Sequence, residues 1–89
     1  MAENRTSSSI VKRLRRAEGH LKSILVMLEE GRSHVEVAQQ LLAVENAITS
    51  ARRTLVHDHI GFCLEEAVRK GQHVGNPSTQ ELRAICKYL

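Results

Sequence analysis

Apolar residues recur along the first third of the chain in alternating steps of four and three residues. They stand at Ile10, Leu14, Ala17, Leu21, Ile24 and Leu28. This heptad spacing lines up one apolar stripe on a single helix. Residues 7–9 are serines that can cap the start of such a helix, and Gly31 can close its end. We therefore expect a first helix from about residue 10, preceded by a polar, flexible N-terminal arm over residues 1–9.

The same alternation returns after Ser33 and continues for much longer. Its members are Val37, Leu41, Val44, Ile48, Ala51 and Leu55, with Phe62 seven residues further on. Since no proline or glycine interrupts it before Gly61, we expect one long helix from about residue 33 to residue 70. Residues 71–77 contain two glycines and a proline, which predicts a loop. Residues 78–81, Ser-Thr-Gln-Glu, fit a capping box for a short third helix carrying Leu82, Ile85 and Leu89.

The long second helix determines the expected architecture. About 37 helical residues span roughly 55 Å, whereas a compact chain of this size is only about 25–30 Å wide. The first helix cannot cover the whole apolar stripe, so we expect an all-α, three-helix chain that forms an antiparallel dimer through its long helices. Residues 10–89 would form a single domain. The sequence has no apolar run long enough to span a membrane, and its polar N-terminal stretch does not read as a signal peptide. We therefore expect a cytosolic protein with reduced cysteines.

Two candidate metal-binding side chains stand one turn apart in the second half of the predicted long helix. His59 and Cys63 are separated by four residues and so share one helical face. Imidazole and thiolate together suit a borderline or soft metal ion. His34 begins the same helix about 37 Å away, too far to share an ion within one chain. In an antiparallel dimer, His34 of one chain approaches the His59–Cys63 pair of the other. Such a three-ligand site suits trigonal Cu(I), or a divalent ion with an open position.

Several segments in a fixed order carry a resemblance to a known protein family. The sequence VKRLRRAEGH begins at residue 11, MLEE begins at residue 27, and HDH at residues 57–59 precedes Cys63. In this order they resemble the CsoR/RcnR/FrmR family of metal- and aldehyde-sensing repressors, over nearly the whole chain from Val11. The resemblance implies three helices, a dimer of antiparallel long helices, and a tetramer made of two dimers. It also implies that the metal-free protein binds operator double-stranded DNA and that the inducer weakens this binding.

The chain departs from the family pattern at the first ligand. The family normally has cysteine at the position of His34, so the copper branch's Cys-His-Cys set becomes His34, His59 and Cys63 here. Aldehyde and persulfide sensing depend on that cysteine and are not expected. Keeping Cys63 favours Cu(I) as the inducer, whereas the imidazole of His34 moves the site toward Ni(II), Co(II) or Zn(II). His20 is a candidate fourth ligand. By the resemblance, Glu81 belongs to a hydrogen-bonding network around the ligands.

Positive charge is concentrated in two short stretches. The candidate DNA-binding residues are Lys12, Arg13, Arg15, Arg16, Arg52 and Arg53. The formal net charge is only +3, so the chain is not basic overall. Only Glu18 interrupts the first stretch, and the second has no nearby acid. Such clustered cations are typical of a surface that binds phosphates, while a solvated helix face is the alternative.

Other classes of function explain less of the sequence. An enzyme is not expected, because the chain has no Gly-rich phosphate loop and no Ser/His/Asp order. A helical metal-storage or carrier protein would explain the ligands but not the basic stretches. His57 is expected to be a polar neighbour of the site, His73 a solvated loop residue, and Cys86 a small buried residue of the third helix. The sequence therefore predicts a metal-responsive transcriptional repressor, released from DNA by Cu(I) or by a divalent metal.

Overall fold

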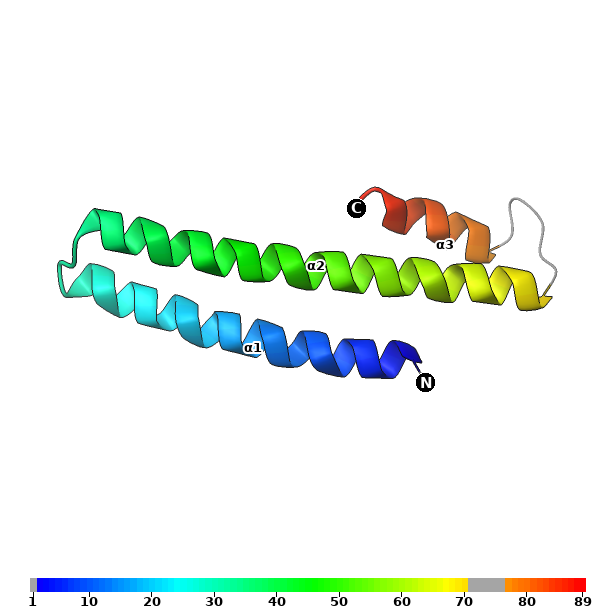
Figure 1. Cartoon of the computed structure of the whole chain (residues 1–89), viewed down its shortest axis with the longest axis horizontal. Helices are drawn as coiled ribbons and strands as arrows, with labels where there is room; N and C mark the ends of the chain where they lie inside the picture. Colours follow the sequence, from blue (N-terminus) through cyan, green and yellow to red (C-terminus); the bar gives the residue numbers. More distant parts are fainter. Residues whose placement is uncertain (1, 71–76) are drawn as a thin grey trace.

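Three helices form the chain in the computed structural model, which describes residues 2–70 and 77–89, with side chains for residues 7–69 and 80–89. Helix α1 (Ala2–Glu29) and helix α2 (His34–Lys70) form an antiparallel hairpin, and α3 (Pro77–Cys86) folds back along the second half of α2 (Figure 1). Within the described residues, α1 and α3 each contact α2 but not one another. The expectation of an all-α chain with three helices is confirmed.

The turn between α1 and α2 is fixed by local sequence. Gly31 has a φ of 73°, a left-handed conformation that glycine adopts without strain. Its amide donates to the carbonyl of Leu28, and the amide of Arg32 donates to that of Met27, which together make a Schellman end for α1. Ser33 then caps α2, because its Oγ accepts hydrogen bonds from the amides of Val35 and Glu36 at 3.2 and 3.5 Å. The first residue of α2 is consequently His34.

Helix α1 begins earlier than the sequence predicted. It starts at Ala2 instead of Ile10, so residues 2–9 are helical and the serines at positions 7–9 lie inside the helix. No proline or glycine stands in this stretch, so nothing in the local chain stops the helix from extending toward the N-terminus.

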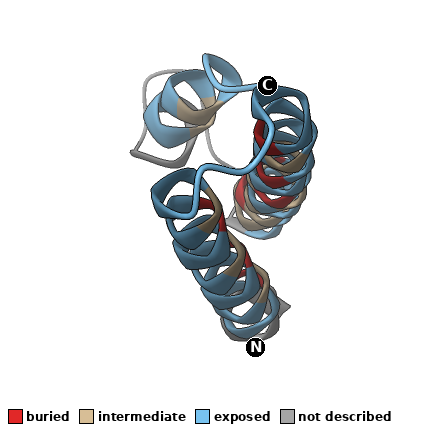
Figure 2. Ribbon diagram, turned by 90° about the vertical axis from the view of Figure 1, so that its left-hand side faces the viewer, coloured by how far each residue is buried: buried red, intermediate tan, exposed pale blue. Residues whose placement is uncertain are grey.

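Only half of each predicted heptad stripe is buried. In α1 every seventh residue is covered, at Ile10, Ala17 and Ile24, and in α2 the buried partners are Val37, Val44 and Ala51. The alternate members are 43–49% exposed: Leu14, Leu21 and Leu28 in α1, and Leu41, Ile48 and Leu55 in α2. Figure 2 shows the buried positions on the sides of the helices that face one another. The α1–α2 contact thus covers one row and leaves a second apolar row on the surface.

The buried face of α2 changes where α1 gives way to α3. Beyond Ala51 the next buried residues are Val56 and Cys63, whereas Leu55, which the heptad pattern predicted to be in the core, is 43% exposed. The cause is that α3 packs on a different side of α2 from α1 (Figure 1). Full burial of an apolar side chain such as Val56 stabilises the fold by about 1.5–3 kcal/mol.

The molecule is long and thin. It measures 59 × 23 × 14 Å with a radius of gyration of 18.0 Å, against about 12 Å for a compact chain of this length. Helix α2 has 37 residues, as the sequence predicted, and sets the long dimension. None of the helices in the described residues has the length and apolar character needed to cross a membrane.

The third helix differs from its prediction in two details. It begins at Pro77, before the capping box expected at residues 78–81, and proline is well suited to the first helical position because it has no amide hydrogen to leave unpaired. Cys86 is exposed rather than buried, since it ends a short helix that contacts only α2. The predicted loop residues 71–76, with His73, lie outside the described residues.

Candidate metal centre and basic surface

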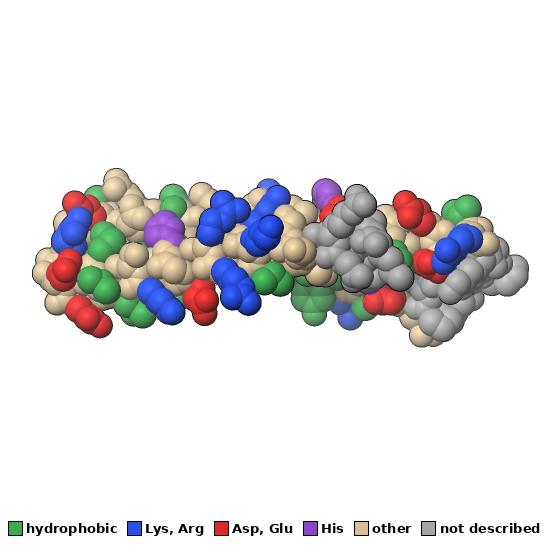
Figure 3. Space-filling view, turned by 90° about the horizontal axis from the view of Figure 1, so that it is seen from below, with side chains coloured by type: hydrophobic (Ala, Val, Ile, Leu, Met, Phe, Trp, Pro, Cys, Tyr) green, Lys and Arg blue, Asp and Glu red, His purple; other side chains and the backbone are tan. Residues whose placement is uncertain are grey.

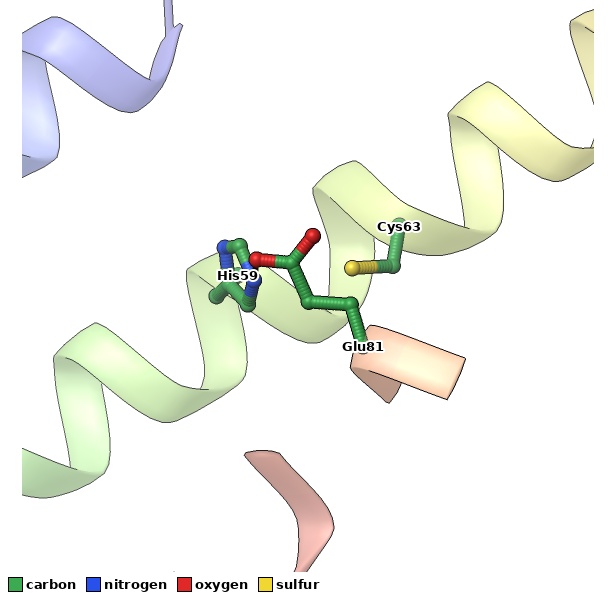
Figure 4. A group of neighbouring side chains, drawn as sticks. All are labelled: His59, Cys63 and Glu81. Carbon is green, nitrogen blue, oxygen red and sulfur yellow. Dashed lines mark hydrogen bonds and ion pairs between the residues drawn. The ribbon is translucent and has the colours of Figure 1, made fainter. Parts of the chain in front are cut away.

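Three side chains that could hold a metal ion lie together where α3 packs along α2. His59 and Cys63 come from successive turns of α2, and Glu81 comes from the first half of α3. One donor atom from each of the three lies within 4.8 Å of the other two. Figure 4 shows the three side chains pointing toward one another between the two helices. The spacing predicted that His59 and Cys63 would share a face, and α3 adds a third side chain from 18 positions further along the chain.

Hydrogen bonding and packing orient the imidazole of His59. Its Nε2 lies 2.9 Å from Oε1 of Glu81, and its ring stacks beside that of Phe62 with centroids 6.1 Å apart. The side chain of His59 is 17% exposed, that of Glu81 is 61% exposed, and Cys63 is 3% exposed. The thiol of Cys63 is therefore shielded from solvent, and the carboxylate of Glu81 lies on the solvent-exposed side of the cluster. A carboxylate on one ring nitrogen directs a metal toward the other nitrogen, Nδ1.

The donors of this cluster fit a metal ion. A thiolate and an imidazole suit soft and borderline ions, and a carboxylate oxygen is a ligand for divalent ones. The hydrogen bond to Glu81 is of the kind that holds metal-bound histidines in place. These side chains allow two arrangements. His59 and Cys63 can bind the ion while Glu81 stays hydrogen-bonded to His59, or the Glu81 carboxylate can turn inward as a third ligand.

The other two histidines named from the sequence lie elsewhere. His34 is exposed at the first residue of α2, about 37 Å along the helix from His59. His20 lies on α1, where its Nε2 forms a hydrogen bond with Oε1 of Gln40. Neither belongs to the donor cluster found among the described residues. Within one chain the structure therefore brings together His59, Cys63 and Glu81, and it leaves His34 and His20 apart from them.

The two basic stretches come together in space. Arg13 of α1 donates from Nη1 to Oγ1 of Thr54 in α2 at 3.1 Å, which sets the basic run of α1 beside Arg52 and Arg53. Lys12, Arg15, Arg16 and Arg53 are exposed, and Arg13 and Arg52 are half-buried. None of the six pairs with a carboxylate among the described side chains. On the face drawn in Figure 3, Lys and Arg side chains gather around the middle, and acidic ones are prominent toward the end at the α1–α2 turn.

Arg52 also contacts the end of the chain. Its Nη1 donates a hydrogen bond to the backbone carbonyl of Tyr88, just beyond α3. Arg52 precedes His59 by seven residues, and Tyr88 follows Glu81 by seven. Two antiparallel cross-links one heptad apart thus join α3 and its tail to α2. Sequence reasoning missed Thr54 and Tyr88 as partners, because a hydroxyl and a backbone carbonyl carry no signal at such separations.

Comparison with known proteins identifies the family. Residues 6–88 match the family described as metal-sensitive transcriptional repressor. The chain belongs to this family.

Several relatives are copper sensors by name. The chain is 37% identical over 76 residues to the copper-sensing transcriptional repressor CsoR of Mycobacterium ulcerans (strain Agy99), covering 85% of this chain and 63% of the relative. It is 38% identical over 60 residues to RicR, another copper-sensing transcriptional repressor, of Mycobacterium tuberculosis (strain ATCC 25618 / H37Rv), covering 67% and 62%. Identity to CsoR of Bacillus subtilis (strain 168) is 30% over 84 residues, covering 94% and 81%.

The chain spans less than two thirds of the length of these two mycobacterial relatives. No solved structure matches the chain significantly.

Proposed function

We propose that this protein is a transcriptional repressor that binds operator DNA without metal and releases it on binding Cu(I). The observation that carries the proposal is the His59–Cys63–Glu81 cluster in a chain of the metal-sensitive repressor family. The basic region that Arg13 joins to α2 is the corresponding DNA-binding surface. The repressor works in the cytosol, where its operator lies.

Cu(I) is the inducer that the donors and the relatives both favour. A buried thiolate and an imidazole suit this soft ion, and the named relatives are copper sensors. Ni(II), Co(II) or Zn(II) is the second candidate, because Glu81 brings a carboxylate oxygen within reach of the other two donors. In the Cu(I) site Glu81 instead keeps its hydrogen bond to Nε2 of His59, and Nδ1 binds the ion.

His34 of a second chain completes the site in this proposal. The exposed apolar row formed by Leu41, Ile48 and Leu55 runs along α2 and needs a partner, and an antiparallel copy of α2 supplies one. The same pairing brings His34 of each chain toward His59 and Cys63 of the other. Two such dimers would form the homotetramer.

DNA binding rests on the six cations of the basic surface. Lys12, Arg13, Arg15, Arg16, Arg52 and Arg53 contact backbone phosphates, and sequence preference follows from DNA shape. Each phosphate contact releases counterions, so DNA affinity falls steeply as salt concentration rises.

Helix α3 offers a physical link between metal and DNA. Glu81 in the first half of the helix bonds His59, and the carbonyl of Tyr88, beyond the C-terminal end of the helix, bonds Arg52. A metal that reorients His59 displaces Glu81, and α3 then carries the displacement to Arg52. Drawing His34 of the partner chain to the same ion also tilts the long helices. Both movements disturb the alignment of the cations with the duplex, so metal favours the state that binds DNA weakly.

Operator affinity measured with and without saturating Cu(I), at a single salt concentration, tests the proposed function. A coupling free energy of the usual size between metal binding and DNA binding predicts that saturating metal lowers operator affinity by about 5- to 150-fold. Ni(II), Co(II) and Zn(II) in parallel titrations identify the inducer as the ion with the largest effect. Metal binding with no DNA binding would point to the carrier alternative, and equal DNA affinities with and without metal would leave a DNA-binding metalloprotein that metal does not control.

A further inference from the structure

A groove of about 330 Å³ runs between α1 and α2 in the middle of the hairpin, well away from the metal cluster. The residues that line it are Arg13, Arg16, Ala17, His20, Ala47 and Ser50. Arg13, Arg16 and His20 follow the spacing i, i+3, i+7 and so form one row on α1. In α2, Ala47 and Ser50 with the neighbouring Thr54 follow the same spacing.

The two rows differ in size and charge. The row on α2 consists of small residues, which leave space between the helices, and the buried Ala17 forms part of the floor. The row on α1 carries two permanent positive charges and an imidazole. None of the lining residues is acidic. A hollow with cationic and hydroxyl groups on its walls and no carboxylate is chemically suited to an oxyanion.

Two hydrogen bonds hold the walls in place. Arg13 on α1 donates a hydrogen bond to Oγ1 of Thr54 on α2 at 3.1 Å, and His20 on α1 bonds the side chain of Gln40 on α2. A guanidinium anchored through one nitrogen keeps several N–H groups for an anion, because arginine has five. His20, named above as a candidate metal ligand, has a more direct role here, since it lies beside the two arginines and apart from His59 and Cys63.

We propose that this groove is an oxyanion site that receives one backbone phosphate of the bound DNA. Arg13 and Arg16 contact the phosphate oxygens, the Ser50 hydroxyl donates a hydrogen bond, and His20 closes the end of the site. This inference rests on the proposed DNA binding and specifies it: one phosphate enters a groove instead of lying on a flat basic face. His20 and Ser50 thereby become DNA contacts that charge counting alone does not identify.

Filling the groove without changing its charge tests the proposal. Ala47→Leu places a larger side chain in the hollow and leaves every cation in place. If a phosphate enters, operator affinity falls about tenfold or more, and the slope of log affinity against log salt becomes shallower by about 0.9. Ala84→Leu makes the same change at an exposed alanine of α3, outside the groove, and should leave both unchanged. Ser50→Ala should weaken binding by about threefold or more, with Ser23→Ala on α1 as its matched control.

The outcomes separate the groove from the function on which it rests. If the wild-type protein binds DNA and Ala47→Leu and Ser50→Ala bind equally well, the groove proposal is wrong while the repressor proposal stands. If the wild-type protein binds no DNA, the repressor proposal fails. Inorganic phosphate titrated into the metal-free protein, followed by the chemical shifts of the Arg13 and Arg16 side chains, then tests the groove by itself. Shifts in the wild type that are absent in Ala47→Leu support a free-anion site, and no shifts in either protein overturn it.

Discussion

The two ends of α2 differ in how much of a metal site each can build within one chain. Near Cys63, helix α3 packs against α2, buries the thiol and sets Glu81 on His59. At the other end His34 stands exposed in the first turn, next to its capping serine. In the proposed function, the first end would receive the metal ion and His34 at the other end would supply a ligand to a second chain. The exposed apolar row between them is the surface that would join the two chains.

The largest effect is expected from breaking the connection between the two ends. Ile48 lies in the middle of the exposed row, and Ile48→Asp would bury an unpaired charge in the proposed dimer at a cost of several kcal/mol. Analytical ultracentrifugation should show dimers and tetramers in the wild type and monomers in the variant. Glu45→Asp changes an exposed carboxylate one turn away and serves as the control. A stable, well-folded monomer in the wild type would contradict the shared site.

Removing the thiolate comes next, because it is the anionic ligand of the proposed Cu(I) site. Cys63→Ala should lower Cu(I) affinity by about 100-fold or more, beyond the effect typical of an outer hydrogen-bonding partner. A competition titration with a Cu(I) chelator measures the loss, and DNA binding by the metal-free variant should persist. Cys86→Ala removes the exposed cysteine and should leave Cu(I) affinity unchanged. The reverse result would move the site to the end of α3.

A smaller effect is expected at the carboxylate that orients His59. Glu81→Gln keeps the size of the side chain but removes its charge, and an outer partner of this kind is worth about 10- to 100-fold in metal affinity. The variant should also show a smaller loss of DNA affinity on adding Cu(I), because α3 no longer responds to His59. If Glu81 were a direct ligand of a divalent ion, Zn(II) affinity would fall far more than Cu(I) affinity in this variant.

The smallest effect is a gradual one with pH. Metal binding requires the deprotonated thiol and an unprotonated imidazole nitrogen, so protons compete with the ion. Cu(I) affinity of the wild type should fall as pH is lowered, and Cys63→Ala should show a weaker dependence. The same chelator titration repeated at several pH values measures both slopes, and identical slopes would exclude the thiol as a ligand.

Local features of the fold were readable from the sequence. The end of α1 at Gly31, the start of α2 near Ser33 and the length of α2 depend on residues near one another, and all three appear as predicted. The division of the heptad stripe could not be predicted, because the stripe does not reveal which row faces α1 and which faces solvent. Val56 replaces Leu55 in the core for a related reason, since the side on which α3 packs is a property of the whole chain.

The candidate site was partly readable for the same reasons. The spacing of His59 and Cys63 along one helix fixes their common face. Glu81 entered through family resemblance, and its contact with His59 depends on how α3 returns along α2. The hydrogen bonds from Arg13 to Thr54 and from Arg52 to the Tyr88 carbonyl join positions far apart in the chain, and no periodicity reports such pairs.

The most direct test of a site shared between the two ends of α2 uses mixed dimers. His34→Ala protomers are combined with Cys63→Ala protomers, and formation of heterodimers is confirmed by native mass spectrometry. In the shared arrangement each heterodimer contains one intact site, with His59 and Cys63 from the first protomer and His34 from the second, and one site that lacks two ligands. A chelator titration should then recover one tight Cu(I) site per heterodimer, although neither parent variant has one. Confirmed heterodimers with no tight site would show that the two ends of α2 do not share an ion.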